Sequence, residues 1–199
     1  MKKLFCFLVM ALALPITLAA CGGVPICDSD EEPPTHTQEE IEARWEERGI
    51  WSATTLEEAS EVAGFEVVSP GFIPEDFCRG LYIHVIDPCL WPTEDFDCGL
   101  SIQVMQTWAA WVEDESLEFS QRASLSLVQT PSSMGTGDVP TEVGGYPATI
   151  DYVGSESDPP FLVTLHWEID GMYFILSGWI ASPLTEELIY EVAASVEVD

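Results

Sequence analysis

The sequence predicts an α+β domain, in which a curved antiparallel sheet of about six strands carries two N-terminal helices and a C-terminal helix packed on one face. Three observations lead to this fold class. Several stretches alternate apolar and polar residues, which is typical of half-buried strands. Asp170-Gly171 lies between two such stretches and predicts a tight hairpin turn. Residues 184–196 instead repeat apolar positions at helical spacing.

The hairpin around Asp170-Gly171 organises the predicted sheet. Every second residue from Phe161 to Ile169 is apolar, so one face of this strand is expected to be buried. A two-residue turn then sets the register, with Ile169 opposite Met172, Trp167 opposite Phe174, Leu165 opposite Leu176 and Val163 opposite Gly178. A slip of one residue would move these side chains into water, so the pattern and the turn predict the same pairing.

The first 21 residues have the parts of a bacterial export signal. Met1-Lys2-Lys3 is positively charged, and residues 4–17 form an apolar run that is too short for a membrane span. Leu18-Ala19-Ala20-Cys21 resembles the lipobox of bacterial lipoproteins. This resemblance implies that the signal peptide, residues 1–20, is removed and that Cys21 is lipidated. A core helix over the same residues is disfavoured because Pro15 would break it.

The resemblance also predicts where the protein is located. A lipidated Cys21 implies an extracytoplasmic protein of the bacterial cell envelope, held on the outer membrane or on the outer face of the cytoplasmic membrane. Residues 21–36 are acidic and rich in proline, and they are expected to form a tether. Their acidic run lacks the spaced oxygens and the glycine of an EF-hand loop, which favours a plain linker over a calcium site. Residues 37–199 then form a single domain.

Two helices are expected at the start of this domain. Thr37 with Glu40, and Thr55 with Glu58, form capping boxes, while Gly49 and Gly64 mark the two ends. Strands are then predicted at 65–68, 81–87, 100–107, 123–129 and 146–152, before the hairpin described above. Residues 131–145 are expected to be a long mobile loop and a candidate binding edge. Ser182-Pro183 starts the last helix, whose apolar residues are expected to cover the sheet.

The cysteines predict disulfide bonds, since an exported domain folds where they form. If Cys89 faces Cys98, the strands before and after them pair Val85 with Ile102 and Ile83 with Val104, so the apolar pairs agree with the cysteine pair. Cys27 with Cys78 follows by elimination. A zinc site is disfavoured because no interval is C-x₂-C.

Three segments together resemble a family of extracytoplasmic domains of unknown function. They are Phe65 to Pro70 with Ile73-Pro74, Leu165 to Phe174, and Leu184 to Leu188 with Ala193 to Val196. Members of this family occur in bacterial lipoproteins and on the outer side of membrane-bound anti-sigma factors. The likeness covers roughly residues 56–196 and implies no catalytic residues. The cysteine-bounded insertion at 89–98 is not typical of the family.

The charge excludes several classes of partner. The chain has 35 acidic residues against 6 lysines and arginines, and only four arginines remain once the signal is removed. Such a chain repels phosphate backbones and anionic lipid surfaces, so nucleic acid is excluded as a partner. The membrane is then reached through the lipid, and an unidentified protein or cationic ligand remains possible. The acidity also has a plain alternative, which is solubility.

No catalytic motif is present. His36 lies in the tether, while His84 and His166 lie on polar strand faces without metal-ligand spacing, so no metal and no cofactor are expected. His166 and Glu168 share a strand face and suit an acid/base pair, although an ordinary polar face explains them equally. The sequence therefore predicts a non-enzymatic binding, sensing or regulatory module. The alternative is an envelope hydrolase or cation-dependent enzyme built from dispersed histidines and carboxylates, which would need a pocket joining His84 and His166.

Overall fold

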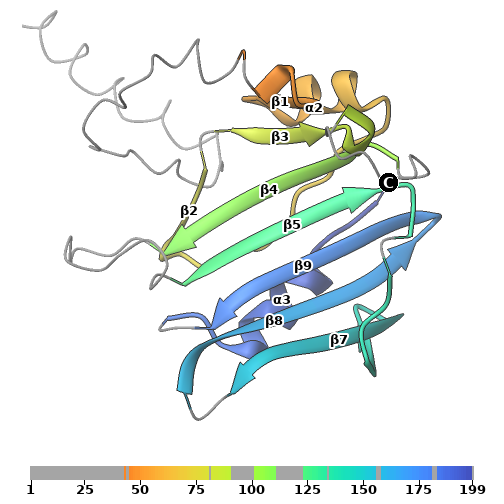
Figure 1. The fold of residues 1–199 in the computed structure, drawn as a ribbon. Coiled ribbons are helices and arrows are strands. Elements are labelled where there is room, and N and C mark those ends of the chain that lie inside the picture. The colour runs from red at the N-terminus through yellow and green to blue at the C-terminus, as the bar shows by residue number, and fades with distance from the viewer. Residues whose placement is uncertain are drawn as a thin grey trace, which may run out of the picture.

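The computed structural model describes residues 43, 45–80, 82–90, 101–110, 123–133, 135–155, 158–180 and 183–198. These residues form one antiparallel sheet of nine strands with two helices, so the α+β class is confirmed and the expected strand number was too low (Figure 1). The strands lie side by side in the order β1-β3-β4-β5-β9-β8-β7-β6, and β2 also pairs with β4. Their bounds are β1 Ile50–Ala53, β2 Phe77–Arg79, β3 Ile83–Ile86, β4 Gln103–Ala110, β5 Ser124–Thr130, β6 Val139–Val143, β7 Tyr146–Ser155, β8 Asp158–Ile169 and β9 Met172–Ile180.

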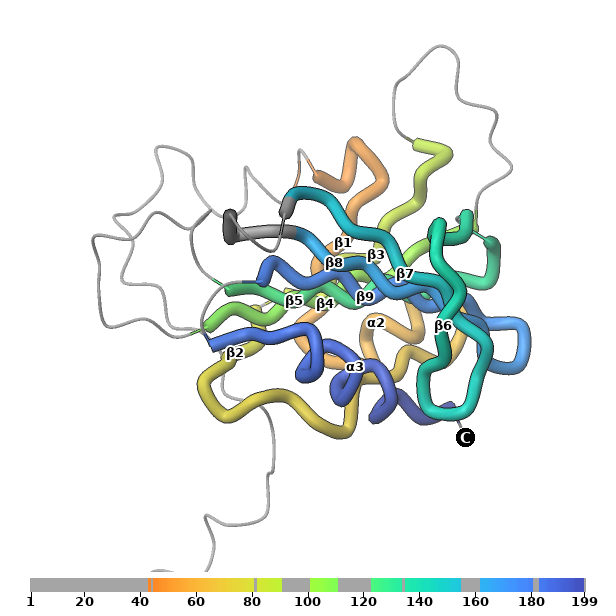
Figure 2. Tube along the Cα trace, turned by 90° about the horizontal axis from the view of Figure 1, so that it is seen from below, coloured from red at the N-terminus to blue at the C-terminus, as the bar shows by residue number. Residues whose placement is uncertain are grey.

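Helices α2 (Leu56–Ala63) and α3 (Glu186–Ala194) pack on the same face of the sheet (Figure 2). We call it the covered face. The alternating apolar residues of the strands point to it and are almost completely buried, as the 0% exposure of Leu165 and Leu176 illustrates. Helix α3 adds Ile189 and Val192 to this core, which confirms that the last helix covers the apolar face.

The core consists of two apolar clusters. The larger one lies between α3 and strands β4 to β9, and the smaller one lies between α2 and strands β1, β3 and β4. The chain crosses the covered face after α2, where residues 65–68 are extended but belong to no strand. The predicted strand at 65–68 was therefore wrong.

The reason for this error lies in two buried glutamines. The Gln129 side chain accepts a hydrogen bond from the Val68 N–H at 3.0 Å and donates one to the Glu66 carbonyl at 2.7 Å. The Gln106 amide donates to the Val68 carbonyl at 2.7 Å. The segment alternates like a strand, but it pairs with glutamine side chains in place of a neighbouring strand.

The two hairpins gave different outcomes. In the β8–β9 hairpin all four predicted pairs are present, from Ile169 with Met172 to Val163 with Gly178. In the β3–β4 pair the predicted register was wrong by two residues, because Val85 pairs with Val104 and not with Ile102. A shift of two keeps every side chain on its own face. Cys89 therefore could not fix the register, since it has left the ladder in the short 3₁₀ helix η1 (Pro88–Leu90).

The helix ends agree only in part with the capping pattern. Helix α2 begins after Thr55, whose side chain accepts from the Glu58 N–H, and ends at Gly64 with a φ of 77°. Helix α3 begins after Thr185, so the start predicted at Ser182-Pro183 was too early. Thr185 as the N-cap, followed by an acidic first turn, marks the start of α3 as well as the Ser-Pro pair would have done.

The first predicted helix lies only partly in the described residues. Ala43, Trp45 and Glu46 are helical, and Gly49 ends this turn with a φ of 73°. The Trp45 and His84 rings contact each other edge to face, with ring centroids 5.1 Å apart. His84 points away from the buried side of β3. This turn therefore contacts the face opposite α2 and α3, and the expectation of three helices on one face was wrong.

Three strands were not predicted, namely β1, β2 and β6. Strand β6 lies inside residues 131–145, where a long loop was expected, and pairs with β7 from Val139 with Ile150 to Val143 with Tyr146. The strand was not predicted because the prolines and glycines around it are typical of loops. No helix among the described residues is long and apolar enough to span a membrane. The expected signal peptide, Cys21 and the tether lie outside the described residues.

Both described cysteines, Cys78 and Cys89, are disulfide-bonded. They are not bonded to each other, because Cys78 pairs with Ala109 on β4 and Cys89 lies beyond the pair of Ile86 with Gln103. Six residues along β4 span about 20 Å, and a disulfide needs Cα atoms within about 7 Å. Cys27 and Cys98 lie outside the described residues, so the pairings Cys89–Cys98 and Cys27–Cys78 stay predictions.

Candidate functional site

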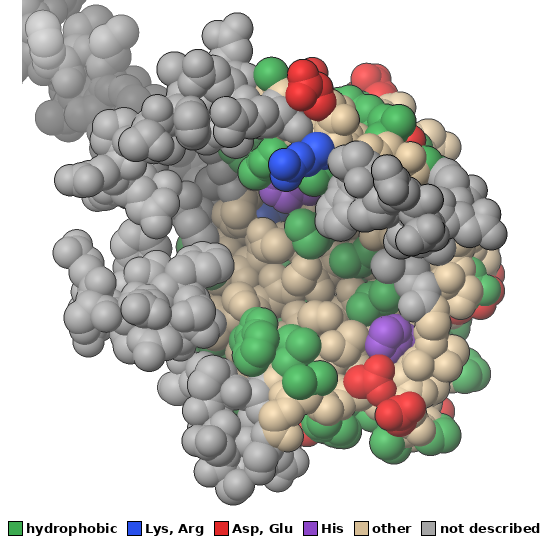
Figure 3. Space-filling view, viewed as in Figure 1, with side chains coloured by type: hydrophobic (Ala, Val, Ile, Leu, Met, Phe, Trp, Pro, Cys, Tyr) green, Lys and Arg blue, Asp and Glu red, His purple; other side chains and the backbone are tan. Residues whose placement is uncertain are grey.

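The face of the sheet opposite α2 and α3, which we call the open face, is polar at its centre. Neighbouring strands align a row of hydroxyl groups that ends at a carboxylate, in the order Thr107, Ser126, Ser177, Thr164 and Asp151. Figure 3 looks onto this face, whose centre is mostly tan, with hydrophobic side chains in separate patches around it. The open face thus differs sharply from the apolar covered face.

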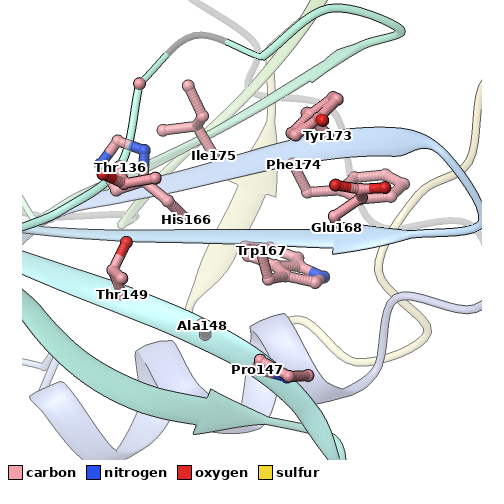
Figure 4. A pocket seen from close by; sticks show the side chains of 11 residues that line it. Thr136, Pro147, Ala148, Thr149, His166, Trp167, Glu168, Tyr173, Phe174 and Ile175 are labelled. Carbon is pink, nitrogen blue, oxygen red and sulfur yellow. The ribbon is translucent and has the colours of Figure 1, made fainter.

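A pocket of about 220 Å³ opens on this face between β7, β8, β9 and the loop 135–137. Strand pairing sets its floor, since Glu168 lies opposite Tyr173, and His166 lies opposite both Ile175 and Thr149. Figure 4 shows His166, Glu168, Tyr173 and Ile175 projecting from the same side of β8 and β9. The full lining is Gly135, Thr136, Pro147, Ala148, Thr149, His166, Trp167, Glu168, Tyr173, Phe174 and Ile175.

The wall of this pocket is a loop fixed to β7 by hydrogen bonds. The Gly137 N–H donates to the Thr149 hydroxyl at 2.6 Å, and the Asp138 N–H donates to the Asp151 carboxylate at 2.6 Å. A Cβ atom on Gly137 would lie 2.9 Å from the backbone of Ile150, so only glycine allows this close approach. These contacts attach the loop to β7, and the binding edge expected at residues 131–145 therefore includes one wall of the pocket.

His166 is a largely enclosed polar side chain of the pocket. Its side chain is 16% exposed, and its Nε2 lies 3.4 Å from the Asp151 Oδ2. Both ring nitrogens are buried, and neither has a hydrogen-bond partner among the described residues. A buried polar atom without a partner costs about 1–3 kcal/mol, so the 3.4 Å approach of the Asp151 carboxylate to Nε2 is a favourable polar contact for this ring.

Glu168 and Tyr173 form the second polar part of the pocket. The Tyr173 hydroxyl donates a hydrogen bond to the Glu168 carboxylate, which raises the pKa of Tyr173, and the negative charge of Glu168 raises that pKa further. Tyr173 therefore keeps its proton at neutral pH.

The structure brings together only some of the residues singled out in the sequence. His166 and Glu168 share the open face as expected, but the carboxylate that contacts His166 is Asp151. His84 lies in the same row of the sheet, separated from His166 by Met105, Val128 and Ile175. Four strand spacings are about 19 Å, so no site joins the two histidines.

His84 has a different environment. Its ring contacts Trp45 and Tyr82, and burial lowers the pKa of His84. His84 is therefore a neutral ring in an aromatic cluster at the β3 edge of the sheet. Among the described residues no group of three or more histidine, cysteine or acidic side chains suits a metal ion.

Sequence reasoning missed Asp151 and Tyr173, whereas Gly135 and Thr136 of the pocket wall lie within residues 131–145, the expected binding edge. Tyr173 follows from the predicted β8–β9 register, which places it opposite Glu168. Asp151 required the β7–β8 register, which does not follow from the turn expected at residues 154–157 because the pairing is shifted between Val153 and Ser155. Comparisons with models of protein families, with curated proteins and with solved structures found no match for this chain. The pocket and the sequence pattern are therefore the grounds for a functional proposal.

Proposed function

We propose that this protein is a lipid-anchored extracytoplasmic envelope protein that acts as a non-enzymatic binding, sensing or regulatory module. The observation that carries the proposal is the pocket on the open face, with its apolar floor at Ile175 and its few polar groups. Binding sites for small molecules have this composition. Its volume of about 220 Å³ exceeds the roughly 150 Å³ of a cavity that holds benzene, so a small molecule or a side chain of a partner fits.

The anchor in this proposal rests on the lipobox resemblance of Leu18-Ala19-Ala20-Cys21. Lipidation of Cys21 would hold the domain at a membrane surface, and the acidic tether would keep the strongly acidic domain at a distance from anionic headgroups. The resemblance to extracytoplasmic domains of lipoproteins and anti-sigma factors favours a sensing or regulatory role over a catalytic one.

A hydrolase is the alternative function, and the contact between Asp151 and His166 favours it. A carboxylate that orients a histidine supplies two of the three members of a hydrolytic triad. The third member is the weak point, because neither nitrogen of His166 has a hydroxyl partner among the described residues. The Thr164 and Ser177 hydroxyls, in the next row, lie 3.2 Å from each other, within hydrogen-bonding distance. Binding is therefore the better supported function.

A variant that fills the pocket tests this proposal. Thr136 is an exposed residue of the pocket wall, so Thr136→Trp should block the mouth and leave the core intact. Ser133→Trp is the matched control, since Ser133 is exposed on the same loop and does not line the pocket. Saturation-transfer NMR with mixtures of small amines, sugars and carboxylic acids should show binding to the wild type and to Ser133→Trp, with loss in Thr136→Trp.

The same variants separate the two functions. If no compound binds, or if Thr136→Trp binds as the wild type does, the pocket is not a ligand site and the proposal fails. If the wild type hydrolyses members of a panel of esters and glycosides, and Thr136→Trp abolishes this activity, the hydrolase replaces the binding module.

A further inference from the structure

We propose that the pocket on the open face binds a small organic cation, namely an amine with an apolar or aromatic body. This inference rests on the proposed binding function and names the class of its ligand. The first observation is the charge around the site. Glu168 lines the pocket, and the Asp151 carboxylate contacts His166, which also lines it. Asp138 lies on the loop that forms the wall.

No lysine or arginine in the described part of the chain lies beside these carboxylates. The two described arginines are Arg48 and Arg79, and the Arg79 guanidinium donates to the Thr54 carbonyl beside β1. Both arginines lie on the β1 and β2 side of the sheet, several strands from β8. The whole chain also has a formal charge of −29, so an anionic ligand would be repelled both by the pocket and by the field of the protein.

The geometry favours an organic cation over a metal ion. Asp151 pairs with Thr164, four residues before Glu168 on β8, which separates the backbone positions of the two acidic residues by about 14 Å along the strand. Metal ligands must instead converge within about 2–2.6 Å of one ion. The described residues around them also contain no cluster of three metal-ligating groups. One carboxylate with a hydrogen bond from tyrosine is instead a partner for an ammonium group.

His166 and Tyr173 supply the other contacts. His166 lies two residues from Glu168 on the same strand face, so both side chains reach one ligand. The two nitrogens of His166 are buried, so this side chain offers the ligand the exposed part of its ring. The Tyr173 ring adds a cation–π contact, and Ile175 contacts the apolar body of the ligand.

The test compares a charged probe with a neutral one of the same shape. 2-Phenylethylamine and 2-phenylethanol are titrated into the full chain in a nonionic detergent, and the dissociation constants are measured by ¹H–¹⁵N NMR. Glu168 is exposed to solvent, which screens its attraction for an ammonium group, so the amine should bind roughly 5-fold more tightly than the alcohol, a difference of about 1 kcal/mol.

Variants identify the group that recognises the charge. Glu168→Gln keeps the shape of the side chain and should weaken amine binding about 5-fold, without affecting the alcohol. Glu191→Gln is the control, because Glu191 is exposed on α3 on the other side of the sheet, and it should leave both constants within about twofold. Tyr173→Phe keeps the ring and the Glu168 charge, and it should retain the preference for the amine.

Each outcome decides the inference. A clear preference for the amine that Glu168→Gln removes supports it. Equal binding of the amine and the alcohol, or an unchanged preference in Glu168→Gln, overturns the cation and leaves the binding function standing. Loss of the preference for the amine in Glu191→Gln would show that distant charge, and not the pocket, attracts the amine. This result also overturns the inference. If neither probe binds while Thr136→Trp abolishes binding of another compound class, only the cation fails; if nothing binds in either experiment, both proposals fail.

Discussion

The β8–β9 and β3–β4 hairpins, both predicted from the sequence, have the same alternating pattern but differ in how their register is determined. β8 and β9 are joined by Asp170-Gly171, with φ values of 51° and 81°, and the pairing follows directly from this turn. β3 and β4 are separated by residues 87–102, and Val85 pairs with Val104. A two-residue turn permits one register, whereas a long connection permits any register that keeps the apolar residues on the same face.

The comparison teaches which information a sequence contains. Alternation determines the face of each residue but not its partner, because registers that differ by two bury the same side chains. A cysteine pair across a long connection does not remove this ambiguity, since Cys89 is already outside the ladder. Only a short turn, with its required backbone conformation, converts a pattern into a set of pairs.

The largest difference between the two hairpins should be in the stability that their buried side chains contribute. Phe174 is fully buried and stacks on Trp167 with ring centroids 5.4 Å apart, so Phe174→Ala should lower the free energy of unfolding by about 3–5 kcal/mol. Val85→Ala removes fewer atoms from the smaller cluster and should cost about 2 kcal/mol. Urea denaturation measures both. Equal losses of unfolding free energy in the two variants would contradict this expected difference.

A smaller effect is expected from the disulfide predicted near the β3–β4 connection. Replacing Cys89 and Cys98 with serine should lower the free energy of unfolding by about 2–3 kcal/mol, the value for a loop of roughly ten residues. The register should not change, because apolar pairs such as Val85 with Val104 determine it. Peptide mapping of the oxidised protein checks the bond, and cross-strand NOEs check the register. A variant that shifts to Val85 with Ile102 would show that the disulfide selects the pairing.

The smallest effect concerns the tight turn. Gly171 has a φ of 81°, so Gly171→Ala should cost about 1–2 kcal/mol. Asp170→Gly is the matched control, since glycine accepts the φ of 51° at that position and should change stability by less than about 1 kcal/mol. Thermal unfolding of both variants measures the difference. A neutral Gly171→Ala would mean that packing, without the turn, suffices to set the β8–β9 register.

The sequence was informative for the fold wherever a local signal decided the structure. The β8–β9 hairpin, the Thr55 cap of α2 and the covering of the sheet by α3 all follow from short patterns. Strand β6 was missed because its residues lie among prolines and glycines that normally mark loops. Residues 65–68 were misassigned because a strand and an extended segment bonded by glutamine side chains have the same alternation.

The candidate site depends on contacts between distant parts of the chain, so less of it could be predicted. His166 and Glu168 were recognised as neighbours because they lie on one strand. Asp151 reaches His166 only through the β7–β8 pairing, and the wall of the pocket depends on Gly137, whose need for close packing is visible only in three dimensions. The pocket is thus a product of register and loop position, which no motif encodes.

The glutamines that bind the crossing segment also restrict which substitutions this chain tolerates. Gln106 and Gln129 recognise only main-chain atoms of Glu66 and Val68, so the side chains at 66 and 68 are free to vary as far as these bonds are concerned. The glutamines themselves have no such freedom. A glutamate at 129 would have no proton to give to the Glu66 carbonyl and would bury a negative charge. In a protein with 35 acidic residues, these two interior positions must remain uncharged amides.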